Sequence, residues 1–283
     1  MSSVASIEIK NGVIAQRIRF VAEPPRGATP LLTLTDPVRR YAVCEEVPPG
    51  VPPSDRAAAD ELCVLFLPGD SATPVDWRHA GEEWLDGPAL ECEQGAIELI
   101  VESDRVLWRP GRAVIIGGGE RSAETLAGLV EFSFHESELR KLECELEADW
   151  PRAESDALVA HDIDRRALAR SARQISEMSR QTALRRIRFA RLSPRLEKPS
   201  FRLGEAARRM VDELAHEVEV ADRLKHVDDR LEVFESLYEL ANDRLADFSY
   251  FRLEYRLEAW IILILVIEVL LMAFELWWSW WLR

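Results

Sequence analysis

The chain has 283 residues, of which 47% are hydrophobic and 30% are charged, and its formal net charge is −14. A chain of this length and composition can bury a substantial core, which excludes an intrinsically disordered protein. Its negative charge also argues against general nucleic-acid affinity of the whole molecule, because a polyanion is repelled at long range.

The N-terminal region, residues 1–134, has the pattern of a strand-rich domain. Short apolar runs with many β-branched residues alternate with clusters of proline and glycine, as expected of strands joined by turns. Because a helical region follows, we expect an α+β fold with strands first and helices after. The predicted strands are residues 4–9, 13–21, 31–35, 62–67, 96–101, 113–116 and 129–134.

Residues 135–257 are predicted to be helical. Ser133 and Glu136 fit a capping box at the start of the first helix, and Pro151 is expected to end it. The further predicted helices are residues 155–180 and 182–192, and the predicted breaks are Ser193-Pro194 and Lys198-Pro199.

A helical hairpin is predicted before the C-terminal apolar run. Residues 203–224 carry apolar side chains at helical spacing, and residues 227–255 carry them in a heptad-like repeat. Asp228 and Asp229 are placed to cap the second helix after a short turn. Both packing within one bundle and a coiled coil between chains produce such stripes, so the pattern leaves both open.

No catalytic or metal-binding motif is apparent in the sequence. The histidines form no H-E-x-x-H pair, no serine lies in a G-x-S-x-G elbow, and residues 117–119 are interpreted as a glycine turn. The four cysteines form no C-x-x-C pair, which is typical of free thiols in a reducing compartment. We therefore predict no catalytic residue, no metal and no cofactor.

A basic island covers residues 163–209, with 14 Lys or Arg against 4 Asp or Glu, so that the rest of the chain carries −24. Three hypotheses account for it: pairing with the acidic remainder of the protein, contact with anionic lipid headgroups, or contact with RNA or the ribosome. The arginines at helical spacing that carry the lipid or RNA hypothesis are Arg165, Arg166, Arg170, Arg173, Arg185, Arg186, Arg188 and Arg191, with Arg195 after them.

Residues 258–283 are predicted to form a single transmembrane helix. The apolar run of residues 259–282 contains 24 residues, and at a rise of about 1.5 Å per residue it is long enough to cross a hydrocarbon core of about 30 Å. Tryptophans at both ends are expected to lie at the membrane interfaces, namely Trp260 at one end and Trp277, Trp278, Trp280 and Trp281 at the other.

The soluble region is predicted to be cytosolic. Residues 1–20 lack the apolar core of a secretory signal, and Arg252 and Arg256 precede the span whereas only Arg283 follows it. The span would then be a tail anchor. Because residues 1–20 contain Glu8 and have a strand pattern rather than that of an Arg-rich presequence, we predict a bacterial inner membrane in preference to a mitochondrial one.

Two glutamates interrupt the predicted span. Glu268 and Glu275 are seven residues apart and share one helical face, and a carboxylate facing lipid is costly. One interpretation is that Glu275 reaches interfacial water and only Glu268 is deep. The other is that both line a helix–helix contact in a homo-oligomer.

The C-terminal region resembles the required for meiotic nuclear division (YagE-like) family. The similarity lies within residues 230–270, in the segments RLEVF at 230–234, LYELANDRL at 237–245, YRLEAWIILI at 255–264 and VIEVL at 266–270. The resemblance also extends to the plan of strands, helices and a final span containing a glutamate. It implies a membrane-anchored oligomer without known catalysis, whose mitochondrial relatives support the translation of membrane proteins.

The sequence thus predicts a tail-anchored, oligomeric membrane scaffold or assembly protein. It would use Glu268 and Glu275 for assembly and the basic island for lipid or RNA. The alternatives are an enzyme acting at the membrane surface with its site in the N-terminal domain, and a channel lined by glutamates.

Overall fold

The structure is a computed structural model that describes residues 13–47, 60–69, 77–86, 95–102, 104–117, 122–161 and 168–281. The predicted strand at residues 4–9 lies outside this part of the chain. The chain forms two compact units. Unit 1 comprises Met1–Asp149 and Leu184–Leu231, and unit 2 comprises Trp150–Ala183 and Glu232–Arg283.

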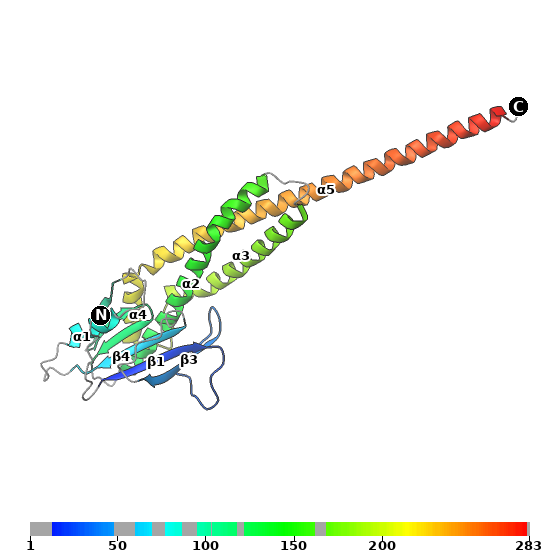
Figure 1. Cartoon of the computed structure of the whole chain (residues 1–283). Helices are drawn as coiled ribbons and strands as arrows, with labels where there is room; N and C mark the ends of the chain where they lie inside the picture. Colours follow the sequence, from blue (N-terminus) through cyan, green and yellow to red (C-terminus); the bar gives the residue numbers. More distant parts are fainter. Residues whose placement is uncertain are drawn as a thin grey trace, which may run out of the picture. The chain divides into compact units, whose positions relative to one another are not determined.

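A mixed sheet of seven strands forms the centre of unit 1 (Figure 1). Its order is β2-β3-β1-β4-β7-β6-β5. Of the described strand pairs, β4 and β7 are parallel and the others are antiparallel. The strands are β1 (Ile14–Val21), β2 (Leu32–Leu34), β3 (Arg40–Val47), β4 (Glu61–Leu67), β5 (Ile97–Val101), β6 (Asp104–Arg109) and β7 (Arg112–Ile116).

One face of the sheet packs against the first part of helix α2 (Ser122–His161). The indole Nε1 of Trp108 donates a hydrogen bond of 2.9 Å to Ser133 Oγ, and the rings of Phe20 and Phe134 lie 5.1 Å apart. These buried aromatic contacts fix α2 over the sheet.

The other face of the sheet is covered by α1 (Trp77–Leu85). Leu85 joins a buried cluster with side chains of β4, β6 and β7. Gly81 allows the close approach, because an added Cβ there would lie 3.2 Å from Leu107 and Val114. Both faces of the sheet are therefore buried, and its central strands have nearly continuous apolar sequences.

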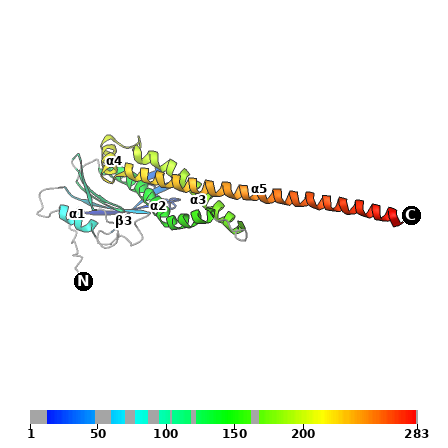
Figure 2. The ribbon, with the colours of Figure 1, turned by 90° about the horizontal axis from the view of Figure 1, so that it is seen from above.

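The remaining helices are α3 (Leu168–Glu197), α4 (Glu205–Glu217) and α5 (Val220–Trp281). In unit 2, α5 continues beyond the other helices as a single rod in both views (Figures 1 and 2). The predicted α+β class, with strands first and one apolar helix at the C-terminus, is confirmed.

The strand predicted at residues 129–134 is wrong, because these residues belong to α2. Leu129, Val130, Phe132 and Phe134 are all buried, and an apolar run buried on every side has no periodicity that separates helix from strand. The capping box is wrong for the same reason. Ser133 lies inside the helix as the acceptor of the Trp108 hydrogen bond.

The helix ends predicted at Pro151 and Ser193-Pro194 are also wrong. Pro151 lies inside α2 and Pro194 lies inside α3. Each proline removes one backbone donor at a cost of about 3 kcal/mol or more, and the rest of each hydrogen-bond ladder holds the helix together.

The start predicted for the last helix at Asp228-Asp229 is wrong as well. α5 begins at Val220, and the turn before it is formed by Glu219, whose φ is +54°. Backbone hydrogen bonds of 3.0 Å from Val218 N to Leu214 O and from Glu219 N to His216 O end α4. A left-handed residue at the end of a helix makes this turn without a capping side chain.

Candidate functional site

The apolar end of α5 has the dimensions of a membrane span. Tyr255–Phe274 comprises 20 residues with a mean hydropathy of 2.5, and none of its most apolar window is buried. Among the described residues, one helix is long and apolar enough to cross a membrane. A core helix of a soluble protein would instead be largely buried. Water-soluble monomers rarely expose apolar patches beyond a few hundred Å², so this surface needs a cover.

Two of the tryptophans predicted at the membrane interfaces have described side chains, and they lie near the two ends of the apolar segment. Trp260 is 62% exposed and Trp277 is 57% exposed. Their separation along α5 fits the two interfaces of a bilayer. The side chains of Trp278, Trp280 and Trp281 lie outside what the structure describes.

Glu268 lies within the apolar segment and is exposed. The side chains one turn away, at Ile264 and Met272, are 59% and 56% exposed. The carboxyl group therefore stands on an apolar helix surface, and no contact with another described residue shields it. The side chain of Glu275 is not among those described, so its pairing with Glu268 stays a prediction.

The arginines named in the basic island differ in whether they are described and whether they are paired. Arg165 and Arg166 lie outside the described residues, and Arg170 lies in α3 with its side chain outside the description. Arg173 is exposed. The remaining four arginines named for the lipid or RNA hypothesis lie in unit 1, where the structure pairs each with a carboxylate.

Arg185 has the most enclosed of these ion pairs. Its Nη2 lies 2.6 Å from Asp149 Oδ2 and its Nε lies 3.3 Å from Glu145 Oε2, and 13% of the side chain is exposed. Arg188 Nη1 donates to Glu145 Oε1 at 2.8 Å. Two arginines thus share one glutamate of α2.

The other two arginines reach different partners. Arg186 pairs with Asp228 of α5. Arg191 Nη2 lies 3.2 Å from Asp36 Oδ1, and Arg195 Nη2 lies 2.6 Å from Asp36 Oδ2. Burial raises the pKa of Asp36, but hydrogen bonds from Arg195 and Thr35 outweigh burial and hold it below its ordinary value. Sequence reasoning missed Asp36, because more than 150 residues separate it from Arg191.

A second ion-pair group joins α2 to α5 within unit 1. Glu136 is 2% exposed and accepts hydrogen bonds from Arg140 at 2.6 Å and from Arg223 at 3.2 Å. Arg223 also lies 2.7 Å from Glu143. Burial lowers the pKa of Arg223, yet these two carboxylates together raise it above its ordinary value. Paired charges of this kind hold helices in register.

His135 is the buried histidine of this region. Burial lowers its pKa to about 4, and its Nε2 lies 3.2 Å from the backbone oxygen of Asp36. It is therefore neutral at physiological pH. Within the described part of the chain, no group of three or more His, Cys, Asp and Glu side chains is arranged to hold a metal ion.

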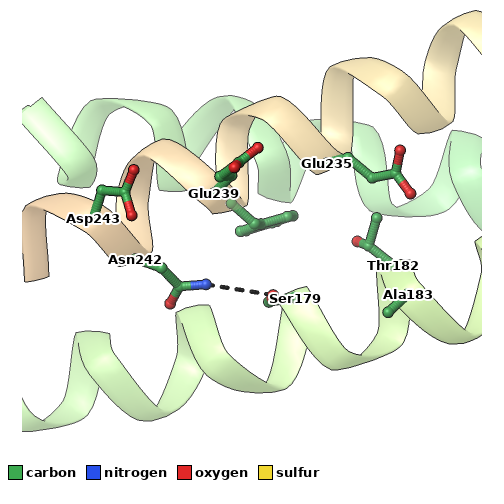
Figure 3. Close-up of a pocket in the computed structure, with 8 residues that line it drawn as sticks. Ser179, Thr182, Ala183, Glu235, Glu239, Asn242 and Asp243 are labelled. Carbon is green, nitrogen blue, oxygen red and sulfur yellow. Dashed lines mark hydrogen bonds between the residues drawn. The ribbon is translucent and has the colours of Figure 1, made fainter. Parts of the chain in front are cut away.

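A polar pocket of about 290 Å³ lies between α3 and α5 within unit 2 (Figure 3). Its walls combine small hydroxyl side chains of α3 with acidic and amide side chains of α5. Sequence reasoning did not find this pocket, because the heptad pattern marks residues 238 and 241 only as core. The lining residues are Ser179, Thr182, Ala183, Glu235, Tyr238, Glu239, Asn242 and Asp243.

Comparisons with known proteins give no family. No protein-family model matches the chain, and no curated protein matches it. Its structure is similar to that of the CorA magnesium transporter from Methanocaldococcus jannaschii, at 10% sequence identity and a TM-score of 0.33, over 87% of this chain and 80% of that chain. A similarity this low carries no argument about the role of this chain.

Proposed function

We propose that the chain is a membrane-anchored oligomeric scaffold, in which the end of α5 crosses the bilayer once and Glu268 contributes to contacts between copies. The observation that carries this proposal is the unburied apolar segment Tyr255–Phe274 with Glu268 in its interior. A bilayer covers the apolar side chains, and a second copy of the chain supplies a hydrogen-bond partner for the carboxyl group, which lipid tails cannot provide.

Glu268 supports assembly through the cost of its exposure to lipid. A charged carboxylate near the centre of a bilayer costs about 2.5–3.5 kcal/mol or more. A hydrogen bond across a helix–helix contact removes part of that cost, and such contacts contribute about 1 kcal/mol each. A channel needs a continuous polar path, and between Trp260 and Phe274 the sequence has no other charged residue.

The test of assembly is the mass of the full-length protein in a mild non-ionic detergent. Replacing Glu268 and Glu275 together by leucine should leave membrane insertion intact and weaken the oligomer, because the shared carboxyl contact is removed. Glu268→Gln, which keeps a hydrogen-bonding side chain, should weaken it less. Glu258→Gln, at the start of the span, is the matched control. An unchanged assembly mass in the double leucine variant contradicts the role of these glutamates.

The orientation proposed for unit 1 is cytosolic, in a bacterial inner membrane. It rests on Arg252 and Arg256, which precede the span. The free, exposed thiol of Cys144 can report the orientation. A membrane-impermeant maleimide should modify the protein in inside-out vesicles and leave it unmodified in intact spheroplasts. Modification in intact spheroplasts would reverse the proposed orientation.

For the basic island, the ion pairs of unit 1 favour the hypothesis that its arginines balance the acidic remainder of the protein. Contact with anionic lipid or RNA stays a prediction, and among the described arginines it now rests mainly on exposed Arg173. The resemblance to the required for meiotic nuclear division family would fit a scaffold of this kind, and it too stays a prediction.

A further inference from the structure

A buried hydroxyl group in the unit 2 pocket lacks a partner among the described residues. Thr182 is 2% exposed, and its Oγ1 makes no hydrogen bond within the part of the chain that the structure describes. A threonine inside a helix usually satisfies its hydroxyl at a carbonyl of the preceding turn. Thr182 instead lines the pocket, and its oxygen faces the space between α3 and α5 (Figure 3). A buried polar atom without a partner is costly, which points to a ligand group that completes it.

Three carboxylates of α5 form the facing wall of this pocket. Glu235, Glu239 and Asp243 follow one another at intervals of four residues. Side chains at this interval lie on one helical face, about 6 Å apart along the axis. Like charges at this spacing repel one another. Among the described residues, Glu239 and Asp243 have no ion-pair partner that would relieve the repulsion.

The spacing of the carboxylates argues against a single metal ion. A divalent cation needs several oxygen ligands within about 2.0–2.6 Å of one point, and side chains placed a full turn apart do not converge in this way. The described residues accordingly contain no metal-binding group. The three carboxylates in a row instead match a ligand whose own positive charges are spaced along a linear molecule.

We infer that this pocket binds a linear polyamine, a chain of ammonium groups separated by short methylene segments. Neighbouring ammonium groups would pair with successive carboxylates of α5, and one of them would donate a hydrogen bond to Thr182 Oγ1. The methylene segments would lie against Ala183 and the ring of Tyr238, which also line the pocket. An ammonium group on the face of an aromatic ring is also favourable.

Hydrogen bonds around the pocket hold its lining side chains in place. Tyr238 is 1% exposed, and its hydroxyl donates to Asp156 Oδ2 at 3.2 Å. Gln174 Nε2 donates to the other oxygen of Asp156 at 2.6 Å. Asn242 Nδ2 donates to Ser179 Oγ at 3.4 Å and joins α5 to α3 beside Glu239 and Asp243 (Figure 3). The ring of Tyr238 is thus fixed before a ligand arrives.

The first test is calorimetric titration of spermidine into the full-length protein in non-ionic detergent at low salt. We expect saturable binding that weakens as salt rises. Glu239→Gln and Asp243→Asn should each weaken it by up to about fivefold, the upper end of the range for an exposed charge pair. Glu232→Gln is the matched control, because it removes one exposed charge from α5 outside the pocket. Equal weakening in the control, or no saturable binding, overturns the inference.

A second variant separates binding from folding. Thr182→Val keeps the shape of the side chain and removes the hydroxyl that lacks a partner. Without ligand, its melting temperature should equal or exceed that of the wild type, whereas its affinity for spermidine should fall about fivefold or more. Unchanged affinity would show that the hydroxyl does not face the ligand. Magnesium or butylamine binding as tightly as spermidine would also overturn the proposal.

Discussion

At the scale of single residues, the basic island shows how ion pairs distinguish enclosed charges from exposed ones. Arg185 is mostly enclosed and has two carboxylate partners on α2, whereas Arg173 on the same helix is exposed. Removing one partner of an enclosed ion pair leaves the other without compensation, which costs more than losing an exposed charge.

We therefore predict that Arg185→Gln lowers the free energy of unfolding by about 1–2 kcal/mol, since Asp149 loses its partner. Urea denaturation measures the change. Arg173→Gln, the matched control, should change stability by less than about 0.5 kcal/mol. If Arg185→Gln leaves stability unchanged and instead weakens sedimentation with anionic vesicles, the charge serves a membrane surface and the pairing hypothesis is wrong.

At the scale of elements, the strands that the sequence predicted best are those with strong apolar runs between turns. β1, β2 and β5 fall within the predicted segments, and β4 and β7 each begin one residue before theirs. β3 and β6 were missed because arginine, glutamate or aspartate stands at their ends. α1 was missed because its sequence, WRHAGEEWL, buries few residues in its nine.

The pocket in unit 2 could not be predicted for a different physical reason. Its two walls come from α3 and α5, and Ser179 and Asn242 are 63 residues apart in the chain. Periodicity identifies the face that each helix buries, yet it does not say which helices meet or which side chain is left unsatisfied. The unpaired hydroxyl of Thr182 is a property of the packing between helices.

At the scale of the whole molecule, α5 carries side chains for unit 1, for the pocket of unit 2 and for the apolar segment. Within one chain, its heptad residues Phe234, Tyr238 and Ala241 are already buried. Val233 and Leu240 on another face are 53% and 47% exposed. The proposed assembly could therefore use either of two surfaces on this helix, which are the apolar segment with Glu268 and the exposed stripe before it.

Truncation after Arg256 separates these two sources, because it removes the apolar segment and keeps the stripe. We predict that the full-length protein is a defined oligomer in mild detergent and that the truncated protein is a monomer, as measured by light scattering. Circular dichroism must show equal helix content in the residues that both proteins share. A truncated protein that stays oligomeric assigns assembly to the Val233 and Leu240 face. If both proteins are monomers, the oligomer proposal fails and Glu268 needs another partner in the membrane.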